Sequence, residues 1–388
     1  MATLGMWKLV QLFGRLYGDK LYLLPYKTSI SNRQMLLIRN ISRKRRYFKI
    51  FCTLCAFGHT LFCFASLCKP FFTRKGQTDP FLPGMSEAVR VVRVYVQILA
   101  ALLPSTFLPM SYVIAFRPVV AEVILCKIIQ FQKETQELTG IKTTHKHLVV
   151  ELGMNVILWI SFTMLLPVVV TGLYLQIDPL HVVVVRTAEE NNTILPLLTR
   201  SMITLLVAYD IATAGNAFFI VGLMVVCSTN DMIQDLRCKP SFRHDLITRF
   251  KEITLYRKLF LWNKYTNQNF CSFSVPPLIF FGISVVVLTY FGTIRMWGKV
   301  GFFLYLAVPA LSVFATCFIV IMIPYAARVL EFSENLILIR LGETSVSKFE
   351  RKTWKSMRPL GIQKLECGSF SVCGLCKTPC YAGLDKAN

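Results

Sequence analysis

The sequence has few charged residues and none of the short motifs that mark common enzymes. Asp, Glu, Lys and Arg make up 16% of the 388 residues, whereas about a quarter is typical of soluble domains. It contains no Walker-type phosphate loop, no His-Glu-x-x-His zinc motif and no pair of carboxylates within an apolar stretch. The apolar stretches also lack the two matching halves of many secondary transporters. We therefore expect no enzymatic activity and no cofactor.

What the sequence has instead is six long apolar stretches. Hydrophobic residues make up 54% of the chain, and the mean hydropathy is +0.53. A helix needs about 20 apolar residues to cross the ~30 Å hydrocarbon core of a bilayer. The stretches cover residues 49–68, 91–116, 149–175, 200–227, 271–295 and 301–325. This pattern predicts an all-α, polytopic transmembrane bundle over residues 49–325, preceded by a cytoplasmic segment 1–48 and followed by a cytoplasmic helix and tail, 326–388.

The basic residues indicate how this bundle is oriented. Most of the 43 Lys and Arg residues fall in the segments that share a side with the N-terminus, including the run Arg43-Lys44-Arg45-Arg46 before the first stretch. Such an excess marks the cytoplasmic side of a membrane protein. Residues 9–17 do not form a convincing cleavable signal peptide. We expect a multi-pass plasma-membrane protein with a cytoplasmic N-terminus. The net charge of +22 then requires no nucleic-acid partner.

Two further signals lie outside the predicted spans. A glycosylation sequon begins at Asn191, in a loop that the charge distribution puts outside the cell. The C-terminal tail carries Cys367, Cys373, Cys376 and Cys380. A zinc knuckle, palmitoylation and no role at all remain open for these cysteines, although their irregular spacing does not favour zinc, and we expect no metal site.

Asp210 is the most unusual residue within a predicted span. A carboxylate at this depth must be paired, protonated or in contact with water. It is either a hydrogen-bonding group between helices or a polar point in a ligand pocket. Prolines in several spans favour kinks that open a cavity between helices. Aromatic residues near the predicted outer halves, Tyr95, Tyr174, Tyr209 and Tyr305, are the other candidate ligand-binding residues, and ordinary packing explains them equally well.

Two segments near the predicted spans carry a family resemblance. In residues 244–262, apolar residues recur at near-helical spacing with basic residues between them. This pattern predicts a helix below the membrane, which either packs on protein or lies on lipid. Tyr256-Arg-Lys-Leu259, followed by Asn267 and Phe270, is similar to the helix that precedes a span in arthropod odorant and gustatory receptors. The segment from Lys355 to Ile362 resembles the one before their final span.

The resemblance implies an oligomeric, ligand-gated, non-selective cation channel built with related receptor subunits. It implies a pocket for a small odorant or tastant among the outer halves of the helices. It also makes Phe250, Ile253 and Tyr256 candidates for contact between subunits.

The sequence departs from this family at one point and leaves other functions open. Family members have a seventh span, but the residues after Ile362 are not apolar enough to cross a bilayer. We therefore expect this chain alone to conduct no ligand-evoked current. A receptor of the G-protein-coupled kind remains an alternative, opposed by the charge distribution and the six stretches. A small transporter or membrane scaffold is another.

Overall fold

A computed structural model of the chain describes most of its residues. The described residues are 3–19, 27–31, 34–38, 43–72, 87–140, 147–174, 180–181, 194–237, 246–298, 302–343 and 346–361. Asn191 and the tail cysteines lie outside the described residues. The prediction that no seventh span follows Ile362 also concerns residues outside them.

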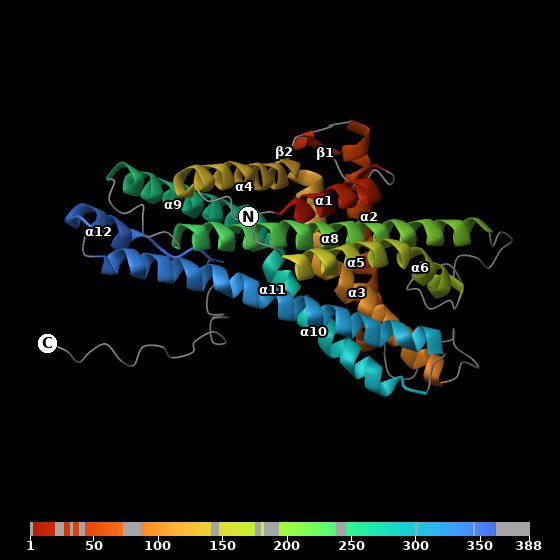
Figure 1. Ribbon diagram of the computed structural model, residues 1–388. Coiled ribbons are helices and arrows are strands. Elements are labelled where there is room, and N and C mark those ends of the chain that lie inside the picture. Colours follow the sequence, from red (N-terminus) through yellow and green to blue (C-terminus); the bar gives the residue numbers. More distant parts are fainter. Residues whose placement is uncertain are drawn as a thin grey trace, which may run out of the picture.

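The fold is an all-α bundle with one short β-hairpin near the N-terminus (Figure 1). The hairpin pairs β1 (Lys27–Ser31) with β2 (Gln34–Ile38) in antiparallel register. The helices are α1 (Leu4–Phe13), α2 (Arg43–Phe72), α3 (Glu87–Phe116), α4 (Pro118–Thr139), α5 (Leu148–Thr163), α6 (Leu165–Tyr174), α8 (Ile194–Arg237), α9 (Leu246–Thr266), α10 (Ser272–Arg295), α11 (Phe302–Gly342) and α12 (Lys348–Ser356). Two π-helical segments, η1 (Gly14–Asp19) and η2 (Asn267–Cys271), follow α1 and α9.

All six predicted apolar stretches are helical over nearly all of the residues that the structure describes in them. Among the described residues, five helical segments are long and apolar enough to cross a membrane: Arg43–Cys68, Val92–Phe116, Leu148–Tyr174, Pro196–Arg237 and Leu246–Arg295. The sixth stretch forms the first part of α11, a helix of 41 residues. The third divides into α5 and α6 at Met164, because Pro167 has no N–H to donate to the carbonyl of Thr163. The fold is therefore that of a multi-span membrane protein.

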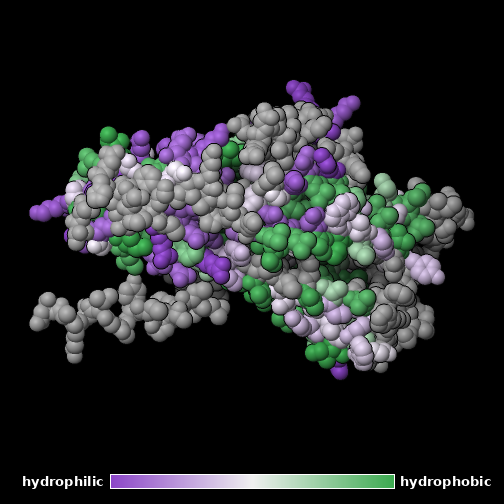
Figure 2. Space-filling view, viewed as in Figure 1, coloured by the Kyte–Doolittle hydropathy of each residue, from purple (hydrophilic) through white to green (hydrophobic). Residues whose placement is uncertain are grey.

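Two helices continue far beyond any bilayer core. At 1.5 Å per residue, the 44 residues of α8 span about 66 Å, and α11 runs beside it for much of that length (Figure 1). In the space-filling view, hydrophobic side chains gather over the half of the molecule with α5, α6 and α10 (Figure 2). Hydrophilic ones gather over the half with α4, α9 and α12. The long helices thus join an apolar half to a polar one.

The polar half contains a compact arrangement that we call the end layer: α9, α12 and residues 357–361. Arg340, near the end of α11, ties this layer to the long helices. Its guanidinium donates to Glu252 on α9 (2.7 Å) and to the backbone carbonyl of Leu236 on α8 (2.8 Å). Burial lowers the pKa of Arg340, but the carboxylates of Glu252 and Glu343 outweigh it and raise the pKa above its ordinary value. The helix predicted over 244–262 and the helix predicted after residue 325 are therefore present in the described residues, as α9 and the end of α11, and they contact each other.

Helix α4 lies between two of the predicted spans and was not predicted from the sequence. Pro118 occupies the first helical turn, where its missing N–H costs nothing, and Gly140 ends the helix with φ at 62°. The buried side chains of Val120, Ile124 and Ile128 repeat every four residues. This stripe packs on α8, and Phe131 contacts Trp262 of α9 edge to face at 5.9 Å.

The N-terminal segment is also more structured than expected. Residues 3–19 form α1 and η1, which pack against α5 and α8 and join the main core of the bundle. Trp7, Phe13 and Tyr17 are buried there. Residues 3–19 therefore belong to the packed bundle, which the sequence did not indicate.

Candidate functional site

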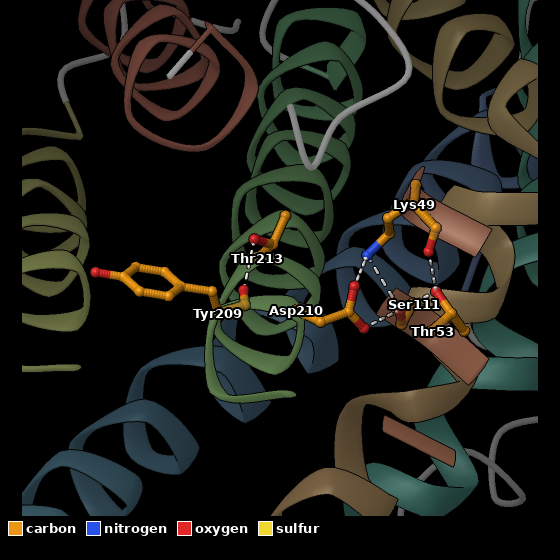
Figure 3. Close-up of polar contacts among 6 residues, drawn as sticks. All are labelled: Lys49, Thr53, Ser111, Tyr209, Asp210 and Thr213. Carbon is orange, nitrogen blue, oxygen red and sulfur yellow. Dashed lines mark hydrogen bonds and ion pairs between the residues drawn. The ribbon is translucent and has the colours of Figure 1, made fainter. Parts of the chain in front are cut away.

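Asp210 forms a buried ion pair with Lys49 (Figure 3). Both side chains are 0% exposed. Lys49 lies near the start of α2, Asp210 in the apolar part of α8, and Ser111 on α3 completes the group. Of the three alternatives considered for Asp210, pairing is the one that the structure shows.

The hydroxyl of Ser111 is the centre of this cluster. It donates to Asp210 Oδ2 at 2.5 Å and accepts from Lys49 Nζ at 3.1 Å. Thr53, one turn after Lys49, lies 2.8 Å from the same hydroxyl oxygen. The Thr53 hydroxyl also donates to the backbone carbonyl of Lys49 at 3.0 Å. Ser111 is thus in contact with a carboxylate, an ammonium and a hydroxyl.

The cluster joins three helices that also pack against one another, α2, α3 and α8. A buried carboxylate or ammonium without a partner is very costly in an apolar environment. The position of α2 relative to α3 and α8 is therefore linked to the pairing of Lys49 with Asp210. A shift of α2 that separates the two groups leaves both charges without compensation, so the cluster favours one arrangement of these helices.

A second polar group lies on another face of α8. Asn216 donates to Ser161 on α5 (2.8 Å) and to the hydroxyl of Tyr17 (3.2 Å). Tyr209, one residue before Asp210, points away from the ion pair (Figure 3). Its ring contacts Phe162 of α5 at 6.2 Å. Neighbouring positions of α8 therefore serve different helix contacts.

The remaining aromatic candidates divide between two places. Tyr95 and Tyr305 join one apolar cluster of α3, α10 and α11 with Met296 and Val308. The hydroxyl of Tyr305 donates to the backbone carbonyl of Thr293 at 3.1 Å. Tyr174, at the end of α6, is 84% exposed. The structure thus brings Tyr95 and Tyr305 together, and it places Tyr174 on the surface.

The buried hydroxyl of Tyr95 fits closely against helix α10. Tyr95 is 6% exposed, and its hydroxyl has no hydrogen-bond partner in the part of the chain that the structure describes. A Cβ placed on Gly292 would lie 2.6 Å from that hydroxyl oxygen. The ring can approach α10 because residue 292 has no side chain.

The three subunit-contact candidates have different positions. Ile253 and Tyr256 are 4% and 1% exposed, packed inside this chain. The ring of Tyr256 lies 5.5 Å from that of Trp354 on α12. These two candidates are therefore corrected, because their side chains offer no area to another subunit. Phe250 is 44% exposed and stacks on Phe349 of α12.

Two residues of the site were missed by sequence reasoning. Lys49 counted only as a flanking charge, and Ser111 carried no signal at all. The rule that a charge within the membrane needs a partner directs attention from Asp210 to a lysine at the margin of a span. No cluster of three or more His, Cys, Asp or Glu side chains suited to a metal occurs among the residues that the structure describes.

Comparison with known proteins adds no family. No protein-family model matches the sequence, and no curated protein matches it.

Proposed function

We propose that this protein is a chemosensory receptor of the odorant and gustatory type in the plasma membrane, with a cytoplasmic N-terminus. In this proposal it binds small molecules between the outer halves of its helices. Together with related subunits it gates a non-selective cation pore.

The observation that carries the proposal is the contact between the two segments that resemble the family. They are about 90 residues apart in the sequence. The hydroxyl of Tyr256 donates to the backbone carbonyl of Arg358 at 3.0 Å. The side-chain amides of Asn263 and Asn267 both donate to the carbonyl of Gly361, at 2.9 and 2.8 Å. Tyr256 and Asn267, two of the residues that carry the resemblance, are thus hydrogen-bonded to the other segment that carries it.

The long helices supply a physical route from a ligand to this unit. Helices α8 and α11 pass without interruption from the apolar half to the end layer. A ligand that alters their packing in the apolar half also moves their far ends, because a packed helix moves as a rigid element. Asn263 and Asn267 then pass this movement to residues 357–361, which directly precede the position of the family's final span.

Recording of ligand-evoked current tests the proposal. The chain is expressed with related chemoreceptor subunits and exposed to panels of volatile and soluble compounds. The proposal predicts inward cation current without a G protein. It also predicts that Asn263→Ala with Asn267→Ala lowers the maximal current at unchanged surface expression. Tyr290→Phe is the matched control, since it also removes a hydrogen bond, to Thr316, but at a position far from the end layer.

Three results contradict the proposal. One is the absence of current with every related subunit. Another is equal current in the double variant and the wild type. The third is ligand-evoked nucleotide exchange on a G protein without current, which favours the G-protein-coupled alternative.

A further inference from the structure

The exposed face of α2 changes along its length from apolar to aromatic to basic. Leu61 and Leu54 are 53% and 57% exposed. Phe51 and Tyr47 follow on the same face, at 54% and 69%. Residues at intervals of three and four share one side of a helix, and the next positions on this side, Arg43 and Lys44, are exposed as well.

This order matches the layers of a lipid leaflet. Aliphatic side chains suit the hydrocarbon, aromatic ones the boundary with the headgroups, and basic ones the headgroups themselves. Tyr47 and Arg43 are separated by about 6 Å along the helix, similar to the thickness of one headgroup region. The opposite face of α2 packs against α3 and α8, so the graded face is the one left for lipid.

Three of the basic residues at this end of α2 have no anionic partner among the residues that the structure describes. Arg43, Lys44 and Arg46 form no ion pair in the described part of the chain, and α2 contains no Asp or Glu. The first turn of a helix is the positive end of its dipole, where further cations are unfavourable. Three exposed cations at this position therefore favour binding of an anionic ligand.

Other arginines next to apolar helix segments have partners within the chain. The guanidinium of Arg117 lies 5.3 Å from the ring centre of Phe273, and that of Arg328 lies 5.4 Å from the ring centre of Tyr325. These cation–π contacts offset part of the cost of keeping a charge near an apolar surface. No such contact is present for the three cations at the start of α2 among the described residues.

We propose that Arg43, Lys44, Arg46 and Tyr47 form a binding site for the phosphate-bearing headgroup of an anionic phospholipid. The three cations face the phosphate, and the Tyr47 ring lies at the level of the glycerol backbone. This ligand is a membrane lipid, distinct from any odorant or tastant, so the site does not depend on the proposed function. A lipid bound at this site holds the first turn of α2 at the bilayer surface, one turn from the buried Lys49.

Native mass spectrometry of the full chain in detergent tests this site, with phosphatidylserine and phosphatidylcholine as the added lipids. Each basic residue near an anionic surface contributes about a fivefold increase in binding. Replacing Arg43, Lys44 and Arg46 by Gln should therefore weaken phosphatidylserine binding roughly 100-fold and leave phosphatidylcholine unchanged. The matched control replaces Lys348, Lys352 and Lys355 of α12 by Gln. This removes the same charge from an exposed helix and should change neither lipid.

The triple variant also removes three of the basic residues that orient the first span in the membrane. Single variants therefore complete the test, because each removes only one of them. Arg43→Gln should weaken phosphatidylserine binding about fivefold, and Arg43→Lys should leave it within a factor of two. Equal binding of both lipids to the wild type overturns the proposal, as does an equal loss in the α12 control. Competition by soluble glycerophosphoserine at the same concentration as the lipid also overturns it, since the site would then recognise free phosphate.

Discussion

Removing one member of the Lys49–Asp210 pair should destabilise the bundle far more than removing both. Asp210→Asn keeps an oxygen that can accept from Lys49 and Ser111, but it leaves the buried ammonium without an anion. Lys49→Met has the converse effect on the carboxylate. The double variant Lys49→Met with Asp210→Leu removes both charges and fills their space with apolar atoms.

The size of the expected loss of stability follows from the fact that both side chains are fully buried. Breaking such a pair by removing one partner costs about 3–5 kcal/mol, a factor of roughly 100 to 5,000 in the ratio of folded to unfolded protein. Replacing a buried pair by hydrophobic residues of similar volume is often neutral or stabilising. We therefore expect each single variant to lose about 3 kcal/mol or more. The double variant should lose less than either single variant, about 1–2 kcal/mol, because the Ser111 hydroxyl loses its partners Asp210 and Lys49 but no unpaired charge stays buried.

Equilibrium unfolding in mixed micelles, followed by size-exclusion chromatography, measures these differences. Glu331→Gln, on an exposed position of α11, controls for loss of one negative charge and should change stability by less than about 0.5 kcal/mol. The reasoning is refuted if the single variants resemble this control. It is also refuted if the double variant loses the sum of the two single losses, because the two charges would then be independent.

Two further predictions concern helix contacts away from the ion pair. Gly292→Ala should destabilise the bundle by about 1–3 kcal/mol, because the new Cβ would lie 2.6 Å from the Tyr95 hydroxyl oxygen. Gly58→Ala is the control, since no atom lies within 4 Å of its Cβ. Equal thermal stability of the two variants would contradict the close contact between Tyr95 and α10. Burial raises the pKa of Glu134, but hydrogen bonds, including one from Lys258 of α9 at 3.0 Å, outweigh it and lower that pKa. This contact therefore stabilises the fold above the unfolded pKa, and its contribution is lost as the pH falls through the lowered folded value. Glu134→Gln should then show a smaller loss of stability on acidification than the wild type, and identical pH profiles would exclude the contribution.

The apolar spans were predictable because hydropathy over about 20 residues is a strong, local signal. The helix at residues 118–139 was missed because its apolar residues form only a stripe. Val120, Ile124 and Ile128 repeat at a helical interval, but charged residues between them keep the window average low. Reading this periodicity as well as the mean hydropathy would have found the helix.

The site could be predicted only in part. Asp210 was recognisable from one residue because a carboxylate in an apolar span is rare. Its partner Lys49 was not, since 161 positions separate them and the packing of α2 on α8 decides the pairing. The same limit applies to Ile253 and Tyr256, whose apolar character indicated burial without indicating whether this chain or another provides it.

The orientation of the chain in the membrane is the most direct test of the proposed receptor. Epitope tags are placed at the N-terminus and between α11 and α12, and antibody binding is measured on intact and permeabilised cells. The proposal predicts that both tags are reached only after permeabilisation. Staining of the N-terminal tag on intact cells would contradict the receptor proposal and favour the G-protein-coupled alternative.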